Sequence, residues 1–211
     1  MLLSGCGFKD GSEIHEATLA YLAIAKKGFE VDFFSLCEDQ SQSFNHRTAT
    51  KLKEVRNIAD ESARIARGKI QEIKNCRVED FDALVIPGGF GVALNFCSFA
   101  NDGEKMVVHP DVENIIFNFY TAKKCIAAIC IAPILLAKVL GEKGIKITLG
   151  ATCDASAIVE KWGAKHITCE KGGFIKDMNY KIYTTPAYMY GESTIDQVNL
   201  GIESMFNDIC H

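Results

Sequence analysis

Long apolar runs, an excess of basic residues and a basic, apolar leader are all missing from this 211-residue sequence. Without an apolar run of spanning length, no transmembrane helix is expected. The formal net charge of −4 argues against nucleic acid or an anionic membrane as the partner. The absence of a leader argues against secretion, so we expect a cytoplasmic protein, or a mitochondrial one if a transit peptide precedes it in a eukaryote.

Metal-ligand spacing is also missing, although the chain contains nine cysteines. None of them forms a C-x-x-C pair, and no two histidines have the spacing of helical ligands, so we expect no metal. Their odd number, and the apolar surroundings of many of them, favour reduced thiols that act as small hydrophobic side chains.

Repeats, linkers and low-complexity segments are absent too, and we expect a single domain over residues 1–211. Apolar segments that fit strands alternate with segments of helical periodicity, which predicts an α/β fold with a largely parallel sheet covered on both faces. The expected strands are residues 1–4, 31–36, 82–86, 124–129 and 145–149, and the expected helices 57–66, 111–122, 132–140, 155–162 and 193–206. Residues 174–185 are expected to form a small β-hairpin, and residues 41–53 a polar loop.

The segment around Cys130 is typical of a nucleophile elbow. An apolar strand reaches Cys130 and turns directly into a helix, with Pro133 in the first helical turn. The amino end of that helix would favour a thiolate and lower the pKa of the thiol. The alternative is an inert, buried cysteine at the end of a strand.

Glycines follow a second buried strand, in the sequence P-G-G-F-G at residues 87–91. They would let backbone N–H groups approach a ligand, and one such group together with the N–H of Ile131 would form an oxyanion hole. The alternative is a plain turn. Ligands bind beyond the carboxyl ends of parallel strands, so residues 5–13, 87–91 and 130–133 should converge.

The first helix is expected to start at Ser12 as its cap, and Glu13 in its first turn could reach Cys130. The alternative is that Glu13 only complements the helix dipole. His15 and Glu16 are expected on a solvated or interface face. The apolar face toward the core is predicted to be Ile14, Ala17, Thr18, Tyr21, Leu22 and Ala25.

Several motifs in chain order resemble those of one superfamily. They are S-G-C-G at 4–7, D-G-S-E-I-H-E-A at 10–17, R-N at 56–57, A-R-I-A-R-G at 63–68, P-G-G-F-G at 87–91, C-I-A-P at 130–133 and T-T-P-A-Y-M at 184–189. Together they resemble the DJ/PfpI branch of the class I glutamine-amidotransferase-like superfamily. Within it the chain is most similar to the enhancing-lycopene-biosynthesis or sigma cross-reacting family, which is associated with isoprenoid biosynthesis and includes mitochondrial ES-type proteins.

The resemblance implies a flavodoxin-like three-layer sandwich, a homodimer and an activity without a cofactor. It also implies roles for particular residues: Cys130 as nucleophile, Glu13 as its carboxylate partner, Gly89 and Ile131 as oxyanion donors, and Gly88, Asn95, Thr185 and Pro186 as substrate-binding residues.

One feature departs from the superfamily pattern. Many members carry a histidine after the strand that follows the elbow helix, but residues 149–154 read L-G-A-T-C-D. The late histidine and acid of glutamine amidotransferases are missing too, which argues against a Cys-His-Glu triad. His109, His166 and His211 lack a motif context and are expected to be structural or exposed.

The resemblance therefore favours a glutathione-independent glyoxalase that converts glyoxal or methylglyoxal to a 2-hydroxy acid. Two alternatives stay open. One is a redox-sensing or chaperone-like protein whose Cys130 is oxidised, and the other is a glutamine-amidotransferase-like subunit.

Overall fold

A mixed sheet forms the centre of the computed structural model, which describes residues 1–210 and leaves His211 outside. Four strands pair in the order β5-β6-β10-β9. They are β5 (Ala83–Ile86), β6 (Cys125–Ile129), β10 (Ile182–Thr185) and β9 (Ile175–Asp177). The pairs β5–β6 and β6–β10 are parallel, whereas β9 runs antiparallel to β10 and confirms the expected hairpin.

Shorter pieces extend the sheet on the β5 side. The N–H of Leu2 donates to the carbonyl of Val85, and the N–H of Leu3 donates to the carbonyl of Phe34. These bonds place the first residues between β5 and β1, as expected of a brief first strand. On this side β1 (Phe34–Ser35) pairs in parallel with β4 (Gln71–Glu72). A separate parallel pair, β7 (Lys146–Ile147) with β8 (Lys165–His166), lies beside β9 and β10 at the other edge.

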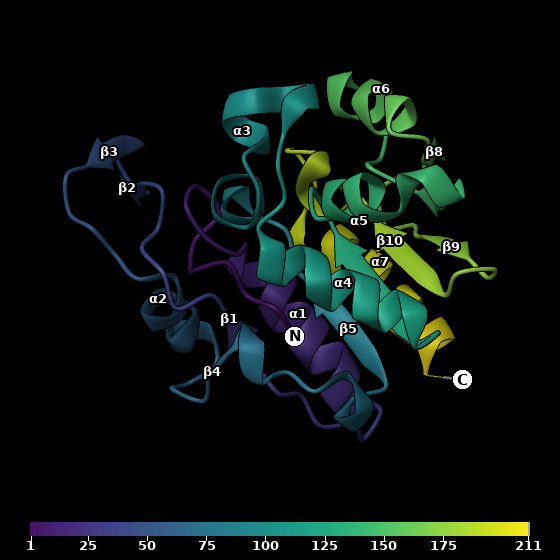
Figure 1. Ribbon diagram of the computed structural model, residues 1–211, viewed down its shortest axis with the longest axis horizontal. Coiled ribbons are helices and arrows are strands. Elements are labelled where there is room, and N and C mark those ends of the chain that lie inside the picture. Colours follow the sequence, from purple (N-terminus) through teal and green to yellow (C-terminus); the bar gives the residue numbers. More distant parts are fainter. Residues whose placement is uncertain (211) are drawn as a thin grey trace.

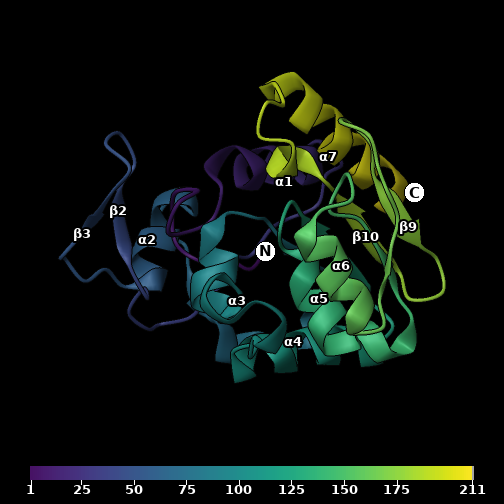
Figure 2. The same cartoon turned by 90° about the horizontal axis from the view of Figure 1, so that it is seen from above.

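Helices cover both faces of the sheet, so the structure is a three-layer α/β sandwich. Viewed from above, α1 and α7 lie on one side of the sheet, with α4 and α5 on the other (Figure 2). The helices are α1 (Ile14–Lys26), α2 (Ile58–Ile65), α3 (Phe99–Asp102), α4 (Pro110–Thr121), α5 (Pro133–Leu140), α6 (Asp154–Lys161) and α7 (Ile195–Ile209).

Local sequence explains the central elements. Residues 126–129 of β6 are fully buried, which fits a strand covered by helices on both faces. The α4 helix has His109 as its cap and Pro110 at its start, where the missing N–H of proline costs no hydrogen bond. Pro133 starts α5 in the same way. Within residues 1–210, no helix is long and apolar enough to cross a membrane.

The prediction of an irregular loop at residues 41–53 was wrong. This segment forms an antiparallel hairpin of β2 (Ser43–Asn45) and β3 (Thr50–Leu52), which projects from the body of the molecule (Figure 1). Tertiary contacts fix its base, because the buried carboxylate of Asp10 accepts the N–H of Phe44 at 2.6 Å. A residue outside the segment therefore anchors the hairpin, which local polarity could not indicate.

The predicted core face of the first helix was wrong except at Ala17, which is buried. Its cap is Glu13 rather than Ser12, and the Ile14 side chain is 44% exposed. The buried face consists of Glu16, Ala17, Ala20, Ala23 and Ile24. Small side chains allow α1 to pack closely, whereas Ile14, Tyr21 and Leu22 are exposed.

Candidate functional site

Cys130 occupies a strained turn between β6 and α5. Its φ of 59° lies in the left-handed region, which side chains other than glycine rarely adopt. The turn is held by the Cys130 N–H, which donates to the carbonyl of Thr185 at 2.9 Å. Cys130 is only 8% exposed, so its thiol is buried directly after the end of β6.

The carboxyl group that meets this thiol belongs to Glu16. Its side chain is fully buried, and its carboxyl group lies beside the Cys130 side chain and raises the pKa of the thiol. One turn earlier, the Glu13 carboxylate instead accepts the N–H of Glu16 at 2.7 Å and caps α1. The expectation that Glu16 faces solvent was therefore wrong, and the structure assigns to Glu16 the contact with Cys130 that we expected of Glu13.

Backbone N–H groups surround the thiol and the carboxyl group. Gly88 N–H donates to Oε2 of Glu16 at 2.9 Å, and Tyr188 N–H donates to Oε1 at 3.3 Å. On the sulfur side, the N–H groups of Ile131 and Gly89 interact with Cys130 and favour its thiolate. Both residues predicted as oxyanion donors thus lie beside the predicted nucleophile.

Burial dominates the electrostatics of the pair. It raises the pKa of Glu16 to about 8, with the nearby Glu13 carboxylate adding to the effect. Burial also raises the pKa of the Cys130 thiol, against the N–H groups of Ile131 and Gly89 that favour the thiolate. The expected lowering of the thiol pKa by the helix terminus is therefore outweighed. At neutral pH Glu16 is mostly a neutral acid, which can donate and accept a proton beside the sulfur.

Gly88 and Gly89 are required by close packing. A Cβ at Gly88 would lie 2.5 Å from the Cys130 Cβ and 2.7 Å from Oε2 of Glu16. Gly89 has a φ of 97°, and a Cβ there would lie 2.3 Å from the Gly11 carbonyl oxygen. The glycines thus bring the loop after β5 against both the thiol and the start of α1, as the P-G-G pattern indicated.

Other predicted substrate-binding residues have different positions. Thr185 is buried at the end of β10 and bonds Cys130 through its carbonyl, with Pro186 directly after it. The Asn95 side chain instead joins loops, since its Nδ2 donates to the carbonyls of Ser4 and Asp10. Contact of Asn95 with a substrate remains a prediction.

Sequence reasoning missed Glu16, although a signal existed. Alanines at 17, 20 and 23 form a stripe of small residues along α1, typical of a helix face packed closely against a neighbour. Glu16 adjoins that stripe, whereas Ile14 lies on the opposite side. Giving the small residues more weight than the large apolar ones would have predicted the correct buried face of α1.

The place where many superfamily members have a histidine is close to the site. Gly150 packs against the segment after β10, because a Cβ there would lie 2.9 Å from the Tyr190 ring and 3.2 Å from the Pro186 side chain. The hydroxyl of Tyr190 donates to the carbonyl of Cys169.

Within residues 1–210, no group of three or more His, Cys, Asp or Glu side chains is arranged to hold a metal ion.

Fold and site together define a class: a three-layer α/β sandwich with a cysteine at a strand-to-helix elbow and a buried carboxyl group beside it. Comparison with known proteins places the chain within that class. Residues 7–184 match the model of the DJ-1/PfpI family, and the chain belongs to this family.

Named relatives are similar over nearly the whole chain. The human glutamine amidotransferase-like class 1 domain-containing protein 3, mitochondrial, is 36% identical, covering 99% of this chain and 81% of its own length. The rat ES1 protein homolog, mitochondrial, is 38% identical with the same coverage. Mitochondrial relatives therefore exist in eukaryotes.

A solved structure shares the fold closely. The isoprenoid biosynthesis protein with amidotransferase-like domain from Ehrlichia chaffeensis superimposes with a TM-score of 0.91 at 38% identity, covering 99% of this chain and 96% of that one. The fold also matches that of the Francisella tularensis Rapid Encystment Protein at a TM-score of 0.61, 15% identity and coverage of 99% and 95%. The flavodoxin-like sandwich is thus confirmed.

Proposed function

We propose that this protein is a glyoxalase-type enzyme that needs neither glutathione nor a cofactor and converts glyoxal or methylglyoxal to a 2-hydroxy acid. The observation that carries the proposal is the contact between the Cys130 thiol and the buried Glu16 carboxyl group, whose pKa is raised to about 8. A carboxyl group with a pKa near neutrality exchanges protons efficiently in both directions. The deep position of the thiol favours a small electrophile.

The reaction would begin with addition of the thiol to the aldehyde. In molecules whose Glu16 is ionised, the Cys130 sulfur forms a bond to the aldehyde carbon and the Glu16 carboxylate takes the thiol proton. The same proton then passes from Glu16 to the aldehyde oxygen, which leaves Glu16 a carboxylate again. The product is a hemithioacetal. The N–H groups of Gly89 and Ile131 stabilise negative charge on that oxygen as the bond forms.

Proton transfer between the two carbons would follow. Glu16 as carboxylate removes the proton from the first carbon, the electron pair forms an enediolate, and the same proton is delivered to the second carbon. The first oxygen gives its proton to the second, which leaves a thioester of the 2-hydroxy acid. The first carbon is oxidised and the second reduced, so no external oxidant is required. Water then hydrolyses the thioester and releases the thiol.

Steady-state turnover of glyoxal and methylglyoxal, followed by chromatography of glycolate and lactate, tests this function. We expect product with the wild type and none above background with Cys130→Ser, which keeps the shape but removes the nucleophile. The matched control is Cys37→Ser, because Cys37 is exposed and lies outside the site. Equal turnover by Cys130→Ser and the wild type would exclude the mechanism.

The amidotransferase-like and redox alternatives give different outcomes. Release of ammonia from glutamine without dicarbonyl turnover would indicate a glutaminase. Stoichiometric oxidation of Cys130 by peroxide without any turnover would indicate a redox sensor. The glyoxalase is favoured over the glutaminase because no late histidine and acid pair stands in the sequence.

A further inference from the structure

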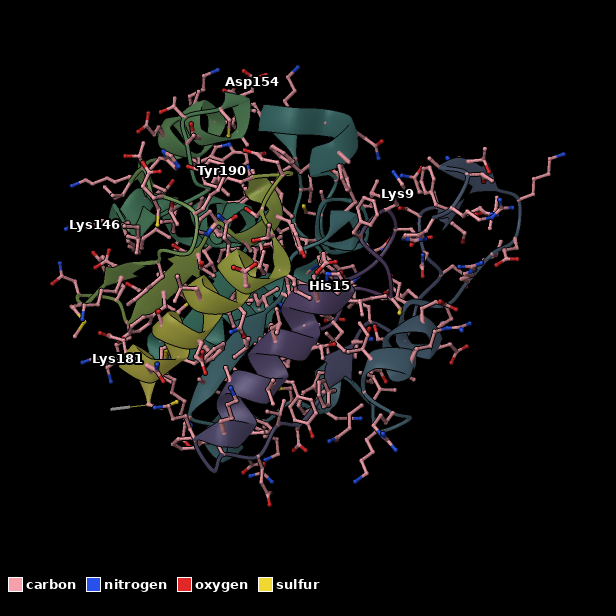
Figure 3. The ribbon with its side chains drawn as sticks, turned by 180° about the vertical axis from the view of Figure 1, so that it is seen from behind. Lys9, His15, Lys146, Asp154, Lys181 and Tyr190 are labelled. Carbon is pink, nitrogen blue, oxygen red and sulfur yellow. The ribbon has the colours of Figure 1, made fainter. Side chains whose placement is uncertain are left out.

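A histidine and a tyrosine form a pair at the edge of the thiol site. Nδ1 of His15 and the hydroxyl of Tyr188 are 2.9 Å apart, and their rings lie 5.9 Å apart between centroids. His15 is exposed at the amino end of α1 (Figure 3), and Tyr188 is half-buried in the segment after β10. The mechanism above uses neither side chain.

The backbone of Tyr188 already belongs to the site, because its N–H donates to Oε1 of Glu16. Tyr188 follows Ala187, whose φ of 43° is a strained, left-handed conformation for a residue with a Cβ. Two residues before that, the carbonyl of Thr185 accepts the N–H of Cys130. Hydrogen bonds to both Glu16 and Cys130 therefore fix the position of this strained segment.

Electrostatics keep the Tyr188 phenol protonated. Burial raises its pKa, and the Glu13 and Glu16 carboxylates raise it further. The contacts of Tyr188 with His15 and Glu16 place it at the start of α1. At neutral pH the hydroxyl is therefore a hydrogen-bond donor beside the site.

The remaining histidines of residues 1–210 lie on other segments of the chain. Nε2 of His46 accepts the N–H of Lys9, and His109 caps α4. His166 lies on β8. Within the described part of the chain, His15 alone among the histidines hydrogen-bonds to a residue that itself contacts Glu16.

We propose that Tyr188 is a catalytic hydrogen-bond donor to the second carbonyl oxygen of a bound 2-oxoaldehyde, and that His15 is the positioning residue that orients its phenol. In this arrangement Nδ1–H of His15 donates to the phenol oxygen, which leaves the O–H of Tyr188 free to donate to the substrate. This rests on the proposed function and deepens it. The first carbonyl oxygen is held by Gly89 and Ile131, and the phenol stabilises the charge on the second oxygen as the enediolate forms. The site is thereby specific for dicarbonyls over simple aldehydes.

A protection assay tests the pair without requiring turnover. Methylglyoxal and propanal are titrated as competitors of Cys130 alkylation by iodoacetamide, read by peptide mass spectrometry. We expect Tyr188→Phe to weaken protection by methylglyoxal about 5–10-fold, the effect of one lost hydrogen bond, with protection by propanal and the uncompeted alkylation rate unchanged. The matched control, Tyr190→Phe, removes a hydroxyl that bonds the carbonyl of Cys169 and should behave as wild type.

Turnover distinguishes the two roles in the pair. We expect Tyr188→Phe to lower kcat for methylglyoxal about 10–100-fold with a smaller change in KM, because the phenol acts on charge that develops in the transition state. His15→Ala should lose a similar amount, whereas His15→Asn should recover most of it, since the amide can still hydrogen-bond the phenol. His15→Ala should add nothing in the Tyr188→Phe background.

The outcomes separate the two proposals. If the protein shows no turnover but methylglyoxal still protects Cys130 in a way that depends on Tyr188, the glyoxalase function is wrong. The role of the His15–Tyr188 pair in binding dicarbonyls would then stand. Protection and turnover that are unchanged in both Tyr188→Phe and His15→Ala would overturn the pair and keep the function. A wild type that methylglyoxal does not protect would overturn the pair as well.

Discussion

Glu13 and Glu16 lie in the same turn of α1, yet their surroundings differ. Glu13 caps the helix with its carboxylate, whereas Glu16 is removed from water beside Cys130. Burying a carboxyl group favours its neutral form, so the raised pKa of Glu16 is a direct result of its position. The chemistry of the site thus depends on which side of the helix each acid occupies.

This burial predicts how stability changes with pH. The pKa of Glu16 rises from 4.5 to about 8 on folding, so between these values the folded chain binds more protons than the unfolded chain. The free energy of unfolding therefore falls as pH rises through that window, by about 1.4 kcal/mol for each pH unit. We expect Glu16→Gln, which does not titrate, to gain stability relative to wild type by a few kcal/mol between pH 5 and pH 8.

Urea unfolding of both proteins at pH 5 and pH 8 measures that difference. Because each protein is compared with itself at the two pH values, differences in stability that do not depend on pH cancel. Hydrogen bonds that the glutamine makes differently are one such difference. If the free energies of wild type and Glu16→Gln change in parallel with pH, Glu16 is not the buried, neutral acid described here.

At the scale of elements, the site is assembled where strands end and helices begin. The loop after β5 brings Gly88 against both the thiol and its carboxyl partner, and the segment after β10 supplies Thr185 and Tyr188. These three-dimensional contacts use main-chain groups. A side chain added at Gly88 would therefore obstruct the approach.

Gly88→Ala should obstruct that approach directly. The added Cβ would lie 2.5 Å from the Cys130 Cβ, so the loop after β5 or the elbow must move. We expect a loss of about 1–3 kcal/mol in stability, as for other overpacked cores, together with loss of Cys130-dependent turnover.

Gly191→Ala is the matched control, since a Cβ there meets no atom within 4 Å. Thermal unfolding and turnover of the two variants give the comparison. A Gly88→Ala protein with wild-type stability and turnover would show that the close approach is unnecessary.

The elements themselves could largely be predicted from the sequence, and the orientation of α1 could not. The apolar run of β6, the proline in α5 and the hairpin of β9 and β10 are local signals, and the structure has all three. The direction in which α1 faces depends on what packs against it. Large apolar residues outweighed the alanine stripe in the prediction, which placed Ile14 inside and Glu16 outside.

Part of the candidate site could likewise be predicted from the sequence, and part could not. Cys130, Gly89 and Ile131 follow from strand-end patterns and lie together in the structure. The direction of the change in the thiol pKa could not be predicted, because the helix terminus indicates a lower value and only the structure reveals the burial that raises it. The hairpin of β2 and β3 likewise depends on Asp10, a residue outside its own sequence.

At the scale of the whole molecule, α1 presents an uncharged face to solvent. Ile14, Tyr21 and Leu22 are 44%, 40% and 46% exposed, and Thr18 between them is exposed too. The face ends at acidic Glu13 on one side and basic Lys27 on the other, so an antiparallel copy of the same helix would complement it in charge. We propose that a second copy of this chain covers it.

Leu22→Asp should weaken that dimer, because it would place a charge in the contact. Light scattering during gel filtration measures the mass, and we expect about twice the mass of one chain for wild type and a monomer for the variant. The control is Val107→Asp, at a position 69% exposed outside this face. A wild type that is monomeric at all concentrations would contradict the proposed contact.

The central claim is that Cys130 and Glu16 form the reacting pair, and one comparison tests it most directly. Lactate formation from methylglyoxal is followed by NMR for wild type, Glu16→Gln and Glu13→Gln under identical conditions, after circular dichroism has shown that all three are folded. We predict a loss of about 10²–10⁴-fold in kcat for Glu16→Gln, as for removal of a positioned acid or base, and nearly wild-type turnover for Glu13→Gln. The reverse order, with Glu13→Gln inactive and Glu16→Gln active, would contradict the account.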